Sequence, residues 1–294
     1  MRPDRGLDRR HSQVRCLDRW GRMNTNGTPT LIGIPYDASS SYLRGAARAP
    51  ARIREALRSP SSNSWSERLV DTGAPGLLVD TGDVRFVDGR DPRDTVTTVI
   101  RRVLEDGGRP VSLGGDHSVT LPILRAVRPH VPKLTILHVD AHPDLYDSFD
   151  GDPFSHACPF ARILEEGLAD RLVQAGIRTM NGHQLDQVRR FGVDVVDMLS
   201  WDAGRRPVVE GPVYVTIDID GIDPAFAPGV SHPEPGGLSV RDVIRLIEGV
   251  RGNVVGADVV EYNPTRDVGD ATAFVCAKLV KELVASMMPD RAVR

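Results

Sequence analysis

The sequence predicts a single α/β domain built on a mostly parallel β-sheet. From residue 30 onward, short continuous runs of Val, Ile and Leu alternate with longer segments of helical periodicity. Continuous apolar runs are typical of strands that are buried on both faces of a parallel sheet. Their alternation with helices is the pattern of repeated βαβ units. Because the chain shows no internal repeat and no flexible linker, its 294 residues are expected to form one domain.

The expected elements follow one another along the whole domain. Strands are predicted where apolar and β-branched residues run together, at 30–34, 76–80, 110–113, 134–139, 171–175, 193–196, 212–217 and 254–260. Helices are predicted where apolar residues recur every three or four positions, at 51–57, 95–104, 121–127, 160–167, 241–252 and 271–287. Ser118 and Ser239 are typical N-caps for two of these helices. Two polar loops, 145–156 and 224–238, directly follow strands, a position where long structured loops are often functional.

Composition excludes several classes of protein. The chain has 37 basic and 40 acidic side chains, and this near-neutral balance argues against a nucleic-acid-binding protein. No apolar run is long enough to cross a membrane. Three widely spaced cysteines do not suggest a disulfide framework, so a reducing cytoplasm is the expected location.

Charge is distributed unevenly between the N-terminus and the rest of the chain. Residues 1–22 hold seven arginines and three aspartates, a net charge of +4, whereas the remainder has a net charge of −7. We expect 1–22 to be a basic extension that is disordered or outside the working protein. The catalytic domain is expected to span 23–294. The excess of acidic groups therefore lies in the predicted domain.

Four predicted strands end in side chains that can bind metal or transfer protons. Gly-Gly-Asp-His-Ser follows the third strand, with His117 in its fourth place, and Asp-Ala-His-Pro-Asp begins at Asp140 after the fourth. Asp-Ile-Asp-Gly-Ile-Asp-Pro begins at Asp218, and Glu261 follows the last strand. Ligands of open α/β sheets bind beyond the carboxyl ends of the strands. All four clusters are therefore expected at the edge where a ligand binds.

Spacing within these clusters favours a metal site. Residues two apart in an extended segment point the same way, which groups Asp140, His142 and Asp144, and likewise Asp218 and Asp220. Buried carboxylates without a partner are costly, and divalent cations remove that cost. Carboxylates with two imidazoles suit Mn²⁺ or a similar borderline metal, and six ligand groups suit a bridged pair of ions.

Each of these residues also has a simpler interpretation. A single Asp at a strand end is more often a turn former or helix cap, and one His can be a hydrogen-bonded core residue. The combination on three strands makes the metal site the better interpretation. Asp116 is expected to brace the Gly-Gly turn and His138 to pack in the core. Cys158 lacks a partner for nucleophilic catalysis.

These residues resemble the ureohydrolases, the family of arginase, agmatinase and related amidinohydrolases. The resemblance rests on Gly-Gly-Asp-His-Ser, Asp-Ala-His-Pro-Asp and Ile-Asp-Ile-Asp-Gly-Ile-Asp-Pro-Ala-Phe-Ala-Pro-Gly, and it covers residues 30–287. Ser-His-Ala at 155–157 and Gly-Val-Ser-His-Pro-Glu-Pro-Gly-Gly-Leu-Ser at 229–239 are most similar to the plant-type arginase and agmatinase branch. The resemblance implies a three-layer α/β/α fold with a parallel sheet of about eight strands.

The resemblance also implies two Mn²⁺ ions and a role for each site residue. One ion would be bound by His117, Asp140, Asp144 and Asp218, and the other by Asp140, His142, Asp218 and Asp220. A hydroxide bridging the ions would attack the guanidinium carbon. Asp144 is expected to be a catalytic residue as well as a metal ligand. His156 matches the family's proton-shuttling histidine, and Glu261 matches the acid that pairs with the guanidinium. A homo-oligomer, either a trimer or a hexamer, is implied as well.

Agmatine is the substrate that the sequence favours, giving putrescine and urea. Asp147, Asp150 and Asp152 lie in the loop before the shuttle histidine, and acidic groups facing the pocket would attract an ammonium and repel a carboxylate. L-Arginine, giving ornithine and urea, is the first alternative, and another guanidino acid such as 4-guanidinobutyrate is the second. Two alternatives of other classes are a deacetylase-like hydrolase and a catalytically inactive relative with a binding or regulatory role.

Overall fold

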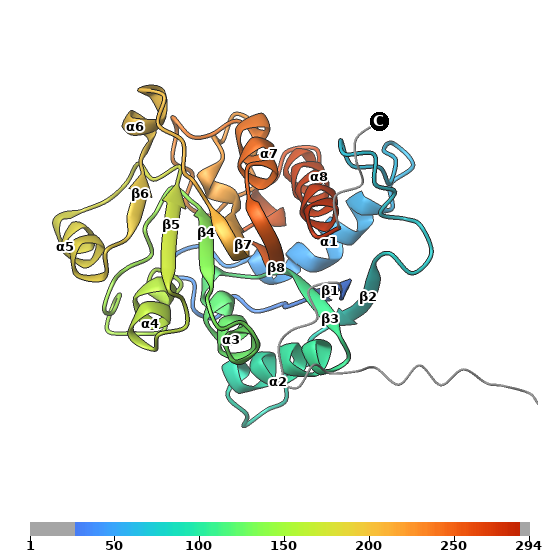
Figure 1. Ribbon diagram of the computed structural model, residues 1–294, viewed down its shortest axis with the longest axis horizontal. Coiled ribbons are helices and arrows are strands. Elements are labelled where there is room, and N and C mark those ends of the chain that lie inside the picture. The colour runs from blue at the N-terminus through green and yellow to red at the C-terminus, as the bar shows by residue number, and fades with distance from the viewer. Residues whose placement is uncertain (1–26, 289–294) are drawn as a thin grey trace, which may run out of the picture.

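The computed structural model of the protein describes residues 27–288. Eight strands form one parallel sheet in the order β2-β1-β3-β8-β7-β4-β5-β6 (Figure 1). The strands are β1 Thr28–Gly33, β2 Val79–Asp83, β3 Gly108–Leu113, β4 Thr135–Val139, β5 Arg171–Ala175, β6 Asp194–Val196, β7 Glu210–Asp218 and β8 Arg251–Val260. The predicted parallel sheet of about eight strands is confirmed. The predicted extension at 1–22 lies outside the described residues.

Helices cover both faces of this sheet (Figure 1). One apolar core joins the sheet to α1 Ala49–Leu57, α6 Met198–Asp202, α7 Val240–Glu248 and α8 Ala271–Ser286. The other core joins it to α2 Pro92–Glu105, α3 Thr120–Val127, α4 Pro159–Glu165 and α5 Gly182–Phe191. The central strands have helices on both faces, which is why most of their residues are buried and many of them are apolar. The three-layer α/β/α arrangement is therefore confirmed. None of the helices among residues 27–288 is long and apolar enough to cross a membrane.

Several elements differ from the sequence prediction. The helix predicted at 241–252 ends at Glu248, and β8 already begins at Arg251. The second strand begins at Val79 rather than residue 76, because Gly76 has a φ of 78° and Leu77 closes a turn onto Ala74. Helix α5 was not predicted, since it is mostly polar and depends on a capping box between Asn181 and Gln184. Helix α6 was not predicted because its five residues are too few to show a period.

Candidate metal centre and substrate pocket

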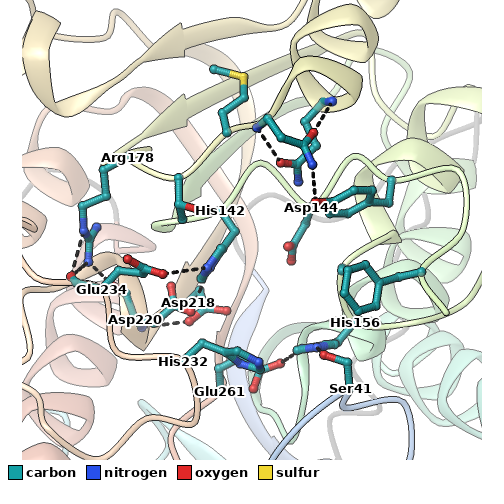
Figure 2. Close-up of a pocket in the computed structure, with 17 residues that line it drawn as sticks. Ser41, His142, Asp144, His156, Arg178, Asp218, Asp220, His232, Glu234 and Glu261 are labelled. Carbon is teal, nitrogen blue, oxygen red and sulfur yellow. Dashed lines mark hydrogen bonds and ion pairs between the residues drawn. The ribbon is translucent and has the colours of Figure 1, made fainter.

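The four predicted clusters lie side by side at one edge of the sheet. Strands β3, β8, β7 and β4 are consecutive neighbours, and all run in the same direction. Their carboxyl ends therefore meet at a single edge, as expected for a ligand site in an open α/β sheet. Figure 2 shows side chains from the ends of β4, β7 and β8 converging on one pocket.

The first group of potential ligands surrounds the ring of His117. Its Nδ1 lies 3.2 Å from an oxygen of Asp140, 3.1 Å from Asp144 and 3.2 Å from Asp218. These side chains come from three different strand ends and are almost completely buried. The structure thus brings together the four residues predicted to hold one ion.

The second group lies beside the first. Nδ1 of His142 is 3.1 Å from Oδ2 of Asp220 and 3.4 Å from Oδ1 of Asp140. Asp140 therefore faces His117 with one oxygen and His142 with the other. Asp218 uses Oδ2 toward His117, and its Oδ1 accepts the backbone N–H of Asp220 at 2.8 Å. Of the two predicted bridging ligands, Asp140 has the clearer bridging geometry.

These distances fit a bound cation better than a proton. Nδ1 of His117 is buried and has no hydrogen-bond partner within residues 27–288, although three oxygens lie equally close to it. Burial opposes a charge on this ring, but its three carboxylate neighbours raise the pKa of His117 well above the usual value. A single proton can satisfy only one of three equidistant oxygens. Ligands about 2.1 Å from one ion, on perpendicular axes, are themselves about 3 Å apart.

The carboxylates of the site need compensating positive charge. Burial, followed by repulsion from Asp140, raises the pKa of Asp144 to about 6. Burial and the neighbouring Asp220 raise the pKa of Asp218 well above its usual range. Collecting so many ionised carboxylates in a buried site is costly unless cations are present. The site therefore has the chemistry of a divalent-metal centre.

A hydrogen-bond relay behind His117 fixes which nitrogen faces the carboxylates. Its Nε2 lies 3.0 Å from Oγ1 of Thr216, which donates its only proton to Asp258 at 2.5 Å. Oγ1 must then accept from Nε2–H, which leaves the lone pair of Nδ1 directed at the site. Asp258 is fully buried and also accepts from Thr120 at 2.9 Å and Tyr214 at 2.8 Å. Thr216, Asp258, Thr120 and Tyr214 were not predicted as site residues from the sequence.

Thr216→Val should weaken metal binding, since it removes the acceptor that fixes the His117 tautomer. We expect a loss in affinity of about 10-fold to 100-fold. The matched control is Thr120→Val, which removes a different hydrogen bond to Asp258 and leaves His117 untouched. Metal affinity would be measured by competition with a chelator. Equal affinities in the two variants would show that the relay does not act on the metal site.

His138 has a larger role than packing. Its ring stacks on Phe160 at 4.0 Å, and its Nε2 lies 2.7 Å from Oδ2 of Asp140. Gln174 Nε2 lies 3.0 Å from the other ring nitrogen. Burial lowers the pKa of His138 to about 4, so the neutral ring accepts from Gln174 and donates to Asp140. Asp116 behaves as predicted, because its carboxylate accepts the backbone N–H of Ser118 within the turn.

The pocket next to the metal ligands contains the predicted shuttle and guanidinium-binding residues. His156 Nδ1 lies 2.8 Å from Oε1 of Glu261 (Figure 2). Burial opposes protonation of His156, but the Glu261 carboxylate outweighs it and raises the pKa of His156 to about 9. His232, which the sequence analysis did not assign, lies between the rings of His142 and His156, with centroids 6.1 and 5.2 Å away. Three imidazoles, those of His142, His156 and His232, therefore line this pocket.

The acidic side chains of the 145–156 loop do not face this pocket, although Tyr146, Phe149 and His156 of the same loop line it. Asp147 is directed at α4 and α5, where it accepts from Gln187 at 2.5 Å and lies 3.6 Å from Arg190. Asp150 is exposed in a turn with a φ of 50°, and Asp152 accepts a backbone N–H in its own loop. None of the three lines the pocket. The electrostatic argument for an ammonium-bearing substrate therefore has no geometric basis.

Comparison with known proteins decides the family. Residues 28–285 match the Arginase family. The chain belongs to the arginase family. It is 46% identical to arginase 1, mitochondrial, of Arabidopsis thaliana over 276 residues, which cover 88% of this chain and 80% of that protein. The agmatinase of Photorhabdus laumondii subsp. laumondii is 37% identical, with coverages of 86% and 85%.

A solved structure of a relative agrees with this assignment. Arginase from Medicago truncatula superposes with a TM-score of 0.85 at 43% identity and covers 89% of this chain and 88% of its own. The protein is thus an arginase-family hydrolase with the arginase-like α/β fold. These similarities support arginase better than agmatinase, which corrects the substrate order predicted from the sequence.

Proposed function

We propose that the protein hydrolyses L-arginine to L-ornithine and urea with two Mn²⁺ ions. The observation that carries this proposal is the greater similarity to plant arginase than to agmatinase, over almost the whole chain. The pocket is consistent with it, because none of the three aspartates of the 145–156 loop lines the space where a carboxylate-bearing substrate would lie. Its lining includes the neutral side chains of Thr179, Asn181 and Gln184, which can hydrogen-bond a substrate carboxylate.

The residues that would hold the ions are those of the two groups described above. His117, Asp140, Asp144 and Asp218 form one set, and Asp140, His142, Asp218 and Asp220 form the other. When bound, divalent ions lower the pKa of water, so that hydroxide is available at neutral pH to attack the guanidinium carbon. Mn²⁺ suits the donor set, which is mainly carboxylate oxygen with two imidazoles.

Glu261 and His156 would act on the substrate itself. Glu261 binds the guanidinium by charge-assisted hydrogen bonds and thereby positions the carbon for attack. Its Oε1 already accepts from the His117 backbone at 2.9 Å and from His156, which leaves Oε2 for the substrate. His156, protonated at neutral pH beside that carboxylate, donates a proton to the departing amine.

Steady-state kinetics on matched guanidino substrates would test this function. With Mn²⁺ present, kcat/KM for urea release from L-arginine is expected to exceed that from agmatine and 4-guanidinobutyrate by at least about tenfold. A higher value for agmatine would restore agmatinase as the function. Urea release from none of the three would favour the inactive relative or a hydrolase of another bond. The cytoplasmic location and the trimer or hexamer expected from the sequence stay predictions.

A further inference from the structure

Both ring nitrogens of His156 are engaged by other side chains. Nδ1 faces Glu261 Oε1, and Nε2 lies 2.8 Å from Oγ of Ser41 (Figure 2). Ser41 is far from His156 in the sequence, and the sequence analysis gave it no role. It lines the pocket and is exposed to it, so that a substrate in the pocket can reach its hydroxyl. The three side chains form a continuous hydrogen-bonded row.

The direction of each hydrogen bond in this row follows from Glu261. Its Oε1 accepts the backbone N–H of His117 at 2.9 Å and lies 2.8 Å from Nδ1 of His156. An oxygen that already serves as an acceptor is matched by a donor at Nδ1, so Nδ1 of His156 carries a proton. Nε2 is then the position at which the ring gains and loses its proton. A hydroxyl can accept from Nε2–H or donate to bare Nε2, and so it matches both states of the ring.

The loop that carries Ser41 is held on both sides of that residue. Before it, the backbone N–H of Ser39 donates to Asp116 at 2.9 Å, and the Ser39 carbonyl accepts the backbone N–H of His156 at 3.2 Å. After it, the Leu43 carbonyl accepts from the Ser231 hydroxyl at 2.8 Å. The Ser41 hydroxyl is therefore fixed relative to the ring of His156, as a proton-transfer partner requires.

We propose that the Ser41 hydroxyl relays the proton of His156 to the departing amine. The inference rests on the proposed function. The leaving nitrogen takes the hydroxyl proton of Ser41 as Oγ takes the Nε2 proton of the imidazolium. The ring is left neutral, with Nδ1–H still donated to Glu261, and the serine is regenerated as a hydroxyl. The catalytic row is thus Glu261–His156–Ser41, in which Glu261 binds the guanidinium and Ser41 delivers the proton to the leaving nitrogen.

Ser41→Ala and Ser41→Thr would test this relay. Alanine removes the hydroxyl, and kcat for L-arginine is expected to fall by about 10-fold to 100-fold, with KM and metal content unchanged. Threonine retains the hydroxyl and should keep kcat within about threefold of the wild type. The matched control is Ser40→Ala, because the Ser40 hydroxyl lies 3.4 Å from Asp116 and makes no hydrogen bond to His156. That variant should resemble the wild type.

A readout independent of turnover is the ¹⁵N chemical shift of the His156 ring, assigned from its loss in His156→Asn. The Nε2 resonance is expected to shift in Ser41→Ala and to stay in place in Ser40→Ala. A wild-type kcat in Ser41→Ala would overturn the relay, and so would an Nε2 resonance that does not move in that variant. The relay would also be overturned if Ser41→Ala and Ser41→Thr lost kcat and melting temperature to the same extent.

If the wild type released no urea from any guanidino substrate, the proposed function would fail together with the proton step. An active wild type with an unaffected Ser41→Ala variant would refute the relay alone.

Discussion

Asp140→Asn is expected to abolish urea release while leaving the fold intact. Asp140 is the residue that faces both groups of potential ligands, one oxygen toward His117 and the other toward His142. An asparagine of the same shape loses the negative charge and presents an N–H₂ donor to one of the two ions. Because the ions held by these residues would supply the attacking hydroxide in the proposed function, we expect a loss in kcat of about a thousandfold or more.

Metal content and activity would be measured on the same sample of Asp140→Asn. The expected result is fewer than two ions per chain, no measurable urea release, and an unchanged circular dichroism spectrum. Asp223→Asn is the matched control, since Asp223 is an acid in the segment that follows β7 but accepts backbone N–H groups of its own loop, from Ala225, Gly236 and Gly237. Two ions and near-normal turnover in Asp140→Asn would show that the metal site has been assigned to the wrong residues.

The grouping of the potential metal ligands could be predicted because each of them lies at or shortly after the carboxyl end of a strand. A residue at the carboxyl end of a parallel strand has its place fixed by the sheet, and period-two alternation then sets its direction. Asp140 and Asp218 illustrate this, whereas His117 lies beyond the end of β3 in a short 3-10 helix. The same rule applies to His138, two residues before Asp140, and alternation could have placed it beside that carboxylate.

The remainder of the site depends on contacts that no local pattern contains. The direction of Asp147 is set by Gln187 and Arg190 on α5, a helix too polar to be recognised by its periodicity. When α5 is not recognised, an acidic loop beside the shuttle histidine predicts a substrate that carries an ammonium group. Ser41 and His156 are 115 residues apart and meet because two loops are bonded through their backbones. Such long-range pairing of irregular segments requires the folded structure.

Glu261→Gln should produce the second large loss, in kcat/KM for L-arginine. Oε1 of Glu261 accepts from the His117 backbone and from His156, so an amide nitrogen in its place would face two donors. If the amide turns round, its nitrogen instead presents N–H groups to the guanidinium cation. Either orientation breaks one set of hydrogen bonds, and both remove the charge that pairs with the substrate. Loss of a buried charge pair of this kind costs about 2–5 kcal/mol, up to about a thousandfold or more.

The pH dependence of the Glu261→Gln variant would separate its two effects. In the wild type, the carboxylate raises the pKa of His156 to about 9, so the ring can donate a proton throughout the neutral range. Without the charge, that pKa falls, and the alkaline decline of kcat should move to lower pH. Glu234→Gln is the matched control, because Glu234 lines the same pocket and lies 4.0 Å from His142 without contacting His156. A similar loss in both variants, with no displacement of the pH profile, would indicate a general effect of pocket charge. A loss confined to Glu261→Gln, with a displaced profile, would place guanidinium binding and control of the His156 proton on one carboxylate.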